Sequence, residues 1–335
     1  MTKYFLGLLL CLWVFPIFGQ KTSIIDSKAI KFEISKNNDS INFIVVDTVL
    51  TQVKPVFLWC QGSLPLSLFV KFENGETWMY GGGISNFDIS NIAKYYHLVV
   101  ISMPKTPVVA NENELKSDYQ YIPTPEFQAE FWKADYLENY TERAGIVLTF
   151  LQEQAWVDNS KLVVAGHSQG LKIASKIASN NKNVTHIGLF AGNPFGRIEI
   201  FIRQARKDAE SGKITWEDAE REMQKWYDFY KSANNPQEIE KYPHLIPWKS
   251  FSVPIIDELL KINIPIYLTY GTADIGSDLC DLMPLYFIRE NKDNLTLKRH
   301  INLEHNFFEI NENGVPDWDK PHWSEVMNEF VEWTR

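Results

Sequence analysis

The sequence predicts an α/β protein with a mostly parallel sheet and helices on both of its faces. Short apolar strand patterns alternate with amphipathic helix patterns through most of the chain, and this alternation is typical of a parallel sheet. The strands are apolar along most of their length, as expected of strands covered on both faces. The alternation is interrupted over residues 195–262, where we expect a helical cap insertion.

The overall composition is that of a globular protein. Of the 335 residues, 45% are hydrophobic and 14% are aromatic, which is enough for a large core. The net charge is −9, and the charges are interspersed. Because no basic stripe is present to follow a phosphate backbone, we expect no nucleic-acid partner. The length allows two domains, but α/β enzymes often reach it as one domain with insertions.

The first 20 residues differ from the rest of the chain. Lys3 precedes an apolar run that is too short to span a bilayer comfortably. We predict a signal peptide over residues 1–20, with an uncleaved anchor as the alternative. Residues 21–335 would then form a single secreted or periplasmic domain with no stable membrane insertion. That domain keeps Cys60 and Cys280, for which buried thiols are the default expectation and a disulfide bond stays open.

The strands and the helix expected in the N-terminal part follow from apolar runs bounded by polar or proline-containing turns. The expected strands cover residues 31–35, 41–48, 55–60 and 97–102, and a helix is expected at 89–96. Gly81, Gly82 and Gly83 are interpreted as a flexible break. The proline-rich stretch that begins at Pro104 is interpreted as a long loop.

The rest of the chain continues the alternation. Its helices are identified by apolar residues that recur on one face, at the spacing of an α-helix. The expected helices cover residues 136–154, 171–178, 279–289 and 323–333, and the expected strands cover 161–165, 184–190, 265–270 and 295–300. Within the insertion, Thr215 and Asp218 are placed like the ends of a capping box and indicate a helix start.

The most informative motif is Gly166-His167-Ser168-Gln169-Gly170. It lies between the strand at 161–165 and a helical pattern, which is the context of a nucleophile elbow. The turn in such an elbow is so tight that small residues must flank the serine. The alternative is a chance Gly-x-Ser-x-Gly sequence in a loop, but the order strand, turn and helix favours the elbow.

A serine nucleophile needs a base and a third group that orients the base, and in this arrangement the acid precedes the histidine in the chain. Asp274 follows the strand at 265–270, and His305 follows the strand at 295–300. We therefore predict Asp274 as the acid and His305 as the base. Asp278 and Asp281 are the alternatives for the acid, but neither follows its strand as directly. Among the seven histidines, His305 alone lies just beyond the last strand.

Acyl transfer also needs donors for the developing oxyanion. The backbone N–H of Gln169 is one expected donor, because it directly follows the serine. The second should come from the loop after the strand at 55–60, at Gly62 or Ser63. An ordinary turn is the alternative interpretation of that loop.

Together these residues resemble the α/β-hydrolase family over most of residues 31–335. The segment from Trp156 to Gly170 is similar to the dienelactone-hydrolase and prolyl-oligopeptidase-like branch, including its acyl-thioesterase relatives. The resemblance implies the fold, a triad of Ser168, Asp274 and His305, and hydrolysis without a metal or other cofactor. Two departures are Gln61-Gly62, where esterases commonly have His-Gly, and Gln169, where prolyl peptidases usually have an aromatic residue.

The expected function is that of a serine hydrolase that cleaves a small-molecule carboxylic ester through an acyl-enzyme intermediate. A peptidase or an acyl-thioesterase would use the same residues, and a non-catalytic binding protein on this scaffold is the alternative of a different class. The insertion could roof an apolar acyl pocket with its aromatic residues, or these residues could simply pack the cap onto the core. They are Trp216, Trp226, Tyr227, Phe229 and Tyr230.

Overall fold

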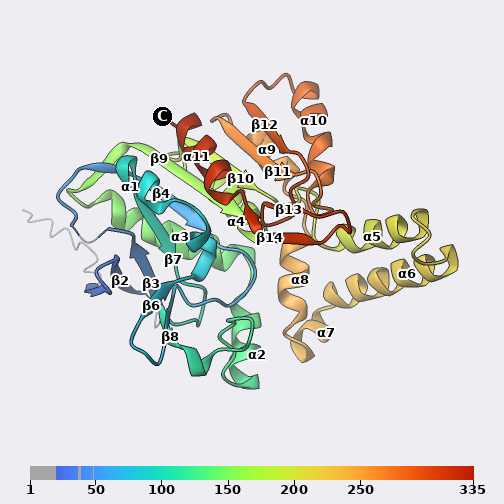
Figure 1. Ribbon diagram of the computed structural model, residues 1–335, viewed down its shortest axis with the longest axis horizontal. Coiled ribbons are helices and arrows are strands. Elements are labelled where there is room, and N and C mark those ends of the chain that lie inside the picture. Colours follow the sequence, from blue (N-terminus) through green and yellow to red (C-terminus); the bar gives the residue numbers. More distant parts are fainter. Residues whose placement is uncertain (1–19, 37–38, 48) are drawn as a thin grey trace, which may run out of the picture.

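The computed structural model describes residues 20–36, 39–47 and 49–335, and a nine-stranded sheet lies at its centre (Figure 1). The strand order is β1-β2-β3-β7-β4-β9-β10-β11-β12. The strands are β1 (Gln20–Ile25), β2 (Ala29–Lys36), β3 (Asp39–Val45), β7 (His97–Ile101), β4 (Lys54–Cys60), β9 (Val157–His167), β10 (His186–Phe190), β11 (Ile266–Gly271) and β12 (Leu295–His300). All pairs from β7 to β12 are parallel, and β1 to β3 form an antiparallel edge. The mostly parallel sheet is therefore confirmed.

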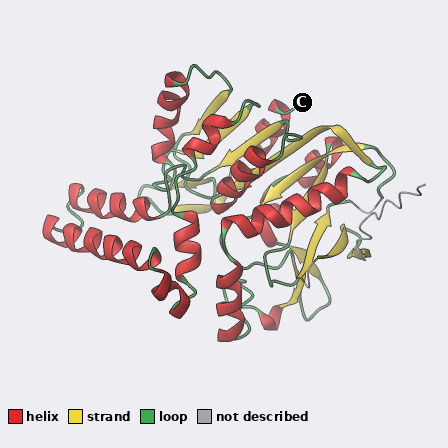
Figure 2. Ribbon diagram, turned by 180° about the vertical axis from the view of Figure 1, so that it is seen from behind, coloured by secondary structure: helices red, strands yellow, loops and turns green. Residues whose placement is uncertain are grey.

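Helices cover both faces of the sheet, as Figure 2 shows from behind. In β4, Val56, Leu58 and Cys60 belong to one core cluster, which is covered mainly by α3 (Leu137–Gln152) and α4 (Gln169–Asn180). Phe57 and Trp59 point to the other face, where α1 (Ile89–Tyr95) and α11 (Trp323–Trp333) complete a second cluster. Successive strand residues point to opposite faces, so a strand covered on both sides must be apolar throughout.

Smaller elements surround this core. The remaining strands are β5 (Phe69–Lys71), β6 (Thr77–Met79), β8 (Val109–Asn111), β13 (Phe308–Ile310) and β14 (Pro316–Pro321). The remaining helices are α2 (Pro125–Ala134), α5 (Ile198–Glu210), α6 (Trp216–Ala233), α7 (Pro236–Lys241), α8 (Leu245–Phe251), α9 (Ile256–Lys261) and α10 (Met283–Arg289), with 3₁₀ turns η1 (Gly81–Asn86), η2 (Glu112–Glu114) and η3 (Asp278–Leu282).

Two segments predicted as a long loop and a flexible break contain helical structure instead. The proline-rich stretch after Pro104 contains α2, because Pro125 occupies its first turn and Thr124 Oγ1 accepts a 3.1 Å hydrogen bond from the amide of Phe127. The glycine run is part of η1 and not a flexible break. Trp59 Nε1 donates a 2.7 Å hydrogen bond to the carbonyl of Gly82, whose φ of +74° suits glycine.

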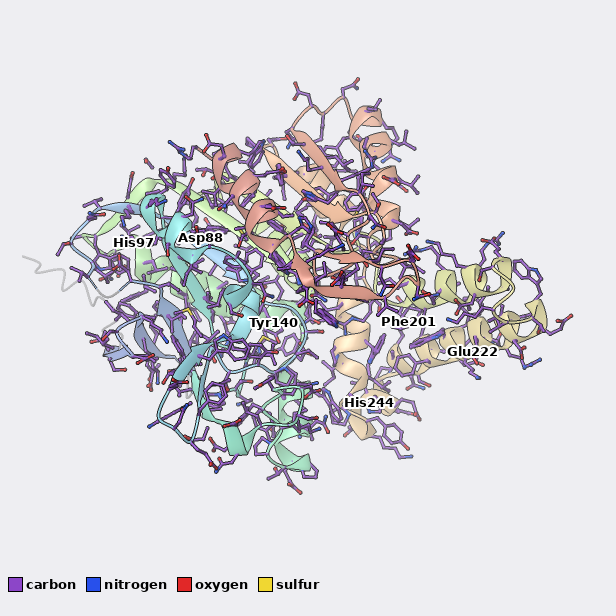
Figure 3. All side chains as sticks on the ribbon, viewed as in Figure 1. Asp88, His97, Tyr140, Phe201, Glu222 and His244 are labelled. Carbon is purple, nitrogen blue, oxygen red and sulfur yellow. The ribbon has the colours of Figure 1, made fainter. Side chains whose placement is uncertain are left out.

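The insertion between β10 and β11 consists of α5 to α9. The hairpin of α5 and α6 projects from the body of the molecule, with Phe201 and Glu222 on its two arms (Figure 3). Phe201 stacks on Trp226 at a centroid distance of 4.0 Å, and both rings contact Trp248 of α8. Aromatic packing therefore holds the base of the hairpin to the rest of the insertion.

Both cysteines in the described residues are free and buried, so Cys60 and Cys280 do not form a disulfide bond. The predicted signal peptide covers residues 1–20, of which residues 1–19 lie outside the described part of the chain and Gln20 begins β1. No helix among the described residues combines the length and the apolar character needed to cross a membrane.

Candidate active site

The three side chains predicted to act together lie at the carboxyl edge of the sheet, where β9, β11 and β12 end. Parallel strands place these ends side by side. Ser168 Oγ is 3.0 Å from His305 Nε2, and His305 Nδ1 is 2.8 Å from Asp274 Oδ2. The structure thus brings together residues that are separated by 137 and 31 positions in the sequence.

Ser168 sits on a sharply turned backbone between β9 and α4. Its φ of +57° and ψ of −120° are unusual for a residue other than glycine. A Cβ atom added at Gly166 would lie 2.2 Å from the carbonyl oxygen of Gly170, and one added at Gly170 would lie 2.1 Å from that of Cys60. Both flanking glycines are therefore required by close backbone contacts, as expected of a nucleophile elbow.

The loops that carry Asp274 and His305 are joined by their backbones. The amide of Thr272 donates to the carbonyl of His300, and that of Ala273 to the carbonyl of Leu303, both at 2.9 Å. A Cβ atom at Gly271 would come within 2.0 Å of the Leu303 oxygen, so only glycine permits this approach. The distance between the acid and the histidine is therefore set by main-chain contacts rather than by side-chain packing alone.

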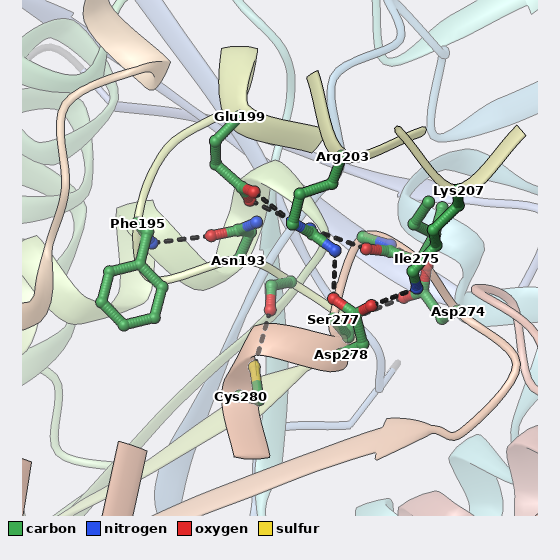
Figure 4. Close-up of polar contacts among 12 residues, drawn as sticks. Asn193, Phe195, Glu199, Arg203, Lys207, Asp274, Ile275, Ser277, Asp278 and Cys280 are labelled. Carbon is green, nitrogen blue, oxygen red and sulfur yellow. Dashed lines mark hydrogen bonds and ion pairs between the residues drawn. The ribbon is translucent and has the colours of Figure 1, made fainter. Parts of the chain in front are cut away.

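Asp274 is buried and fully engaged as a hydrogen-bond acceptor. Burial alone would raise the pKa of its carboxyl, but the bond to His305 and the donors Ser277 Oγ and Gly276 N lower it below its ordinary value. The alternatives are placed elsewhere. Asp278 pairs with two basic residues of α5, Arg203 and Lys207 (Figure 4). Asp281 pairs with Arg299 and accepts from Tyr270.

His305 lies between the acid and the serine, with about one-third of its side chain exposed. Because a carboxylate can only accept, Nδ1 carries the proton and Nε2 is left to accept from the serine hydroxyl. Burial lowers the pKa of His305, but the hydrogen bond and the charge of Asp274 outweigh it, and the net shift is upward. The imidazole of His305 is thus arranged to act as a base, and Asp274 stabilises its protonated form.

His167, inside the elbow, supports the His305 loop. Its Nε2 donates a 2.9 Å hydrogen bond to the backbone carbonyl of His305, and the two rings are 4.8 Å apart. Trp323 packs edge-on against the same ring at 5.0 Å. Burial, followed by the charge of His305, lowers the pKa of His167 to about 3, so this ring stays neutral. The sequence did not indicate this role.

The predicted oxyanion donors lie around Ser168. The loop after β4 brings Gly62 beside the serine, since a Cβ atom added at Gly62 would be 3.9 Å from that of Ser168. Gln61 fixes the loop by donating to the carbonyl of Ile101. Gln169 begins α4, and the first amides of a helix have no acceptor within it. Gly62 and Ser63 face the same pocket as Ser168.

That pocket has a volume of about 390 Å³ and adjoins both Ser168 and His305. Its lining also includes Tyr80, Gly82 of the glycine run, and Trp323. None of the five insertion aromatics expected to form a roof lines this pocket or the smaller one beside it, within the described part of the chain. Trp216, Tyr227 and Tyr230 are exposed, and Trp226 and Phe229 pack against Trp248.

A polar network that the sequence analysis missed extends from the elbow. Gln169 Nε2 donates to Asp135 Oδ1 at 3.0 Å, and Gln169 Oε1 accepts from Arg197. Tyr140 also donates to Asp135, at 2.9 Å. Burial raises the pKa of Asp135 to about 6, although these hydrogen bonds and Arg197 oppose the shift. The position of Arg197 just after β10, at the same sheet edge, was the available signal.

No protein-family model matches the sequence, and no curated protein does so either. Solved structures do match. An acylaminoacyl peptidase from Pyrococcus horikoshii aligns at a TM-score of 0.50 and 13% identity, over 94% of this chain and 41% of its own. A 2,6-dihydroxy-pseudo-oxynicotine hydrolase aligns at 0.52 and 11%, over 92% and 68%. Acetyl xylan esterase 1 from Thermoanaerobacterium sp. aligns at 0.50 and 12%, over 96% and 89%.

At such low identities the likeness shows the fold alone. The sheet order, the helices on both faces and these matches give the chain the α/β-hydrolase fold, so the predicted fold is confirmed. The chain spans less than half the length of several peptidase structures that it matches.

Proposed function

We propose that this protein is a serine hydrolase that cleaves a carboxylic ester through an acyl-enzyme intermediate. The observation that carries the proposal is the hydrogen-bonded series Ser168, His305 and Asp274, with the serine on a strained turn at the start of α4. A buried, ionised acid with a histidine and a serine in line is the arrangement that activates a hydroxyl for acyl transfer.

In the proposed mechanism, His305 Nε2 takes the proton of Ser168 as the serine oxygen attacks the substrate carbonyl. Asp274 keeps the imidazole in the required tautomer and stabilises its cation. Backbone N–H groups of Gln169 and of Gly62 or Ser63 would stabilise the oxyanion, and each such donor is typically worth about 10²–10³ in rate. His305 then protonates the leaving alcohol, and a water molecule activated by the same histidine releases the acid.

Esters are favoured over amides by the elbow, which has Gln169 after the serine in place of the aromatic residue usual in prolyl peptidases. Among the matched folds, one is named an esterase and one a hydrolase, but peptidases also occur. The bond type is therefore to be measured on matched ester, thioester and amide substrates with the same acyl group. Ester turnover that exceeds amide turnover is expected, and the reverse order would make the protein a peptidase.

The nucleophile is tested with a fluorophosphonate probe, which reacts with activated serines irrespective of the natural substrate. The parent protein should be labelled at Ser168, and Ser168→Ala should abolish labelling and hydrolysis. Ser179→Ala, on the same helix α4, is the control and should be labelled like the parent. Labelling that survives Ser168→Ala would identify another nucleophile, and a folded parent that is not labelled would favour a non-catalytic protein.

We also infer that the protein is exported and loses residues 1–20, because this segment has the composition of a signal peptide. Mass spectrometry of the protein recovered from the periplasm or medium should show a chain that begins near Lys21. A full-length chain retained in the membrane fraction would favour an uncleaved anchor.

A further inference from the structure

A second, small pocket lies beside Ser168, and the Gly62 loop does not line it. Its volume is about 70 Å³, and its lining includes Ser168 and His305. The remaining polar side chains that line it are Gln169, Lys172, Asn193 and Arg197, and none of its lining residues is an Asp or Glu. Two cationic side chains and two amides therefore line a space next to the reacting serine, with no carboxylate among the lining residues.

Arg197 is the first of these donors. Its guanidinium donates to Gln169 and lies over the rings of Trp248 and Phe251, with centroids at 5.3 and 5.5 Å. No carboxylate of the described residues lies within ion-pair distance of it, although Asp135, which shares Gln169 as a hydrogen-bond partner, acts on it by its charge. A guanidinium has five N–H donors in one plane, so most of them remain available.

Asn193 is the second donor, and it is 95% buried. Its Oδ1 accepts a 2.7 Å hydrogen bond from the amide of Phe195 (Figure 4), which leaves Nδ2 as the other end of the side chain. Nδ2 is buried and has no partner among the described residues. An unpaired buried donor is costly, and because Asn193 lines the pocket, an acceptor on a bound ligand would satisfy it.

Lys172 completes the set from α4. Its ammonium donates to the carbonyls of Phe251 and Val253 at 2.7 and 3.2 Å, which leaves one of its three donors. Burial, and then the positive charge of Arg197, lower the pKa of Lys172 to about 7. The charge of Glu199 opposes this shift, but Glu199 is itself bound by Arg203 (Figure 4). An anion in the pocket would stabilise both cations.

We propose that this pocket binds a carboxylate of the substrate, so that the ester cleaved at Ser168 carries an anionic group a few bonds from its reacting carbonyl. This inference rests on the proposed function, because it specifies the substrate class of the same site. Planar donors such as Arg197 suit a carboxylate, and Asn193 Nδ2 would supply a further hydrogen bond.

The sizes of the two pockets agree with this assignment. The small pocket has room for a carboxylate and one or two methylene groups, and the 390 Å³ pocket at Gly62 accepts the bulkier half of the ester. The carboxylate can belong to the acyl part or to the alcohol part of the substrate. The pocket would bind the carboxylate in the same way in both cases, and substrates that carry it on one part or the other distinguish the two.

The test uses two matched pairs of esters. Their hydrolysis is measured by the release of acid at constant pH. Monomethyl succinate and methyl levulinate differ only in an acyl-side carboxylate. Acetoxyacetate and acetoxyacetone differ likewise on the alcohol side. In at least one pair, the parent protein should prefer the anion by about 10- to 100-fold in kcat/KM, as expected for charge-assisted hydrogen bonds. A ratio near one in both pairs would overturn the proposal.

Variants identify the residues that cause the preference for the anionic ester. Arg197→Met should bring the ratio of anion to neutral ester close to one, and Arg197→Lys should restore part of it. Asn193→Asp keeps the acceptor for Phe195 but turns the free donor into an acceptor, so the ratio should fall below one. The control is Arg206→Met, at an exposed position of α5, which should keep the parent ratio. An unchanged ratio in Arg197→Met and Asn193→Asp would contradict the proposal.

Failure of the proposal can be separated from failure of the proposed function. A protein that is labelled by fluorophosphonate but shows no preference for anions retains its function and loses the subsite. If the folded protein is neither labelled nor active, thermal unfolding decides the subsite directly. Succinate, but not succinamide, should then raise the Tm of the parent and leave that of Arg197→Met unchanged. The absence of such a shift in the parent would overturn the inference.

Discussion

The carboxyl edge of the sheet and the helical insertion are built on different physical principles. At the sheet edge, Ser168, Asp274 and His305 are placed by main-chain contacts, such as the bonds that join the Thr272 and Ala273 amides to the next loop. In the insertion, side-chain contacts dominate, as in the stack of Phe201 on Trp226. The edge therefore holds the groups proposed to react in one geometry, whereas the insertion leaves much of its aromatic surface exposed.

The two regions meet at Arg197, directly before α5. This residue belongs to the insertion in sequence, yet its guanidinium bonds to Gln169 of the elbow. The root of the insertion therefore contributes to the site through Arg197 and through Ile200 in the first turn of α5, whereas α6 lines neither pocket at Ser168 in the described part of the chain. An insertion can therefore contribute to a site by its attachment point rather than by its bulk.

The largest effect is expected at the sheet edge. Asp274→Asn should lower kcat by about 10⁴-fold, because an amide can hold the imidazole in the wrong tautomer and does not stabilise its cation. Asp278→Asn, at the carboxylate paired with the insertion, is the matched control and should change kcat by less than about threefold, as expected for a partly exposed ion pair. Steady-state ester hydrolysis measures both. Similar losses in the two variants would remove the distinction between edge and insertion.

The pH dependence should show the influence of Asp274 on His305. Only neutral His305 can accept the serine proton, and its pKa lies above its ordinary value of about 6.5. As the pH falls below that raised pKa, kcat/KM for a neutral ester should decrease about tenfold per pH unit. In Asp274→Asn, the inflection should move to lower pH because the carboxylate charge is lost. An inflection that stays in place would show that another group controls the profile.

A smaller effect is expected when support for the histidine loop is removed. His167→Phe keeps a ring against Trp323 but loses the donor to the His305 carbonyl. We expect kcat to fall about 5- to 10-fold, the equivalent of one neutral hydrogen bond. His186→Phe, at the start of β10 and so at the other edge of the sheet, is the control and should leave kcat unchanged. If both variants keep full activity, the contact is structural only.

The smallest effect on activity is expected in the projecting hairpin. Trp226→Ala removes the stack on Phe201 and should lower the free energy of unfolding by about 2 kcal/mol, with kcat/KM within threefold of the parent. Tyr227→Ala, at an exposed position of the same helix, should change the free energy of unfolding by less than about 0.5 kcal/mol. Urea unfolding and ester kinetics measure the two quantities. A large loss of kcat/KM for long acyl chains in Trp226→Ala would restore the idea of an aromatic roof.

The positions of the three proposed catalytic residues could be predicted because they depend on local signals. The apolar runs at 161–165, 265–270 and 295–300 identify strands, and parallel strands bring their carboxyl ends together. Gly166 and Gly170 mark a turn that no other residue fits. Each of these signals lies within a few residues of the side chain that it predicts, and the structure places Ser168, Asp274 and His305 accordingly.

The other parts depend on contacts between distant segments, and these leave little trace in the sequence. Helix α2 was missed because Pro125 was interpreted as a loop residue, although proline is also favoured in the first turn of a helix. The short strands β13 and β14 form a separate two-stranded sheet, and β14 carries few apolar residues. Asp135 and Arg197 are joined through Gln169, and neither has a motif of its own.

The two buried thiols offer a native readout of how the site comes apart. Cys60 ends the strand beneath the elbow, and Cys280 donates to the Gly192 carbonyl beside the small pocket. Burial raises the pKa of both thiols, so neither reacts with an alkylating reagent while the surrounding structure stays closed. The two alkylation rates therefore report, without any engineered label, whether the two sides of the serine open as one cooperative unit or separately.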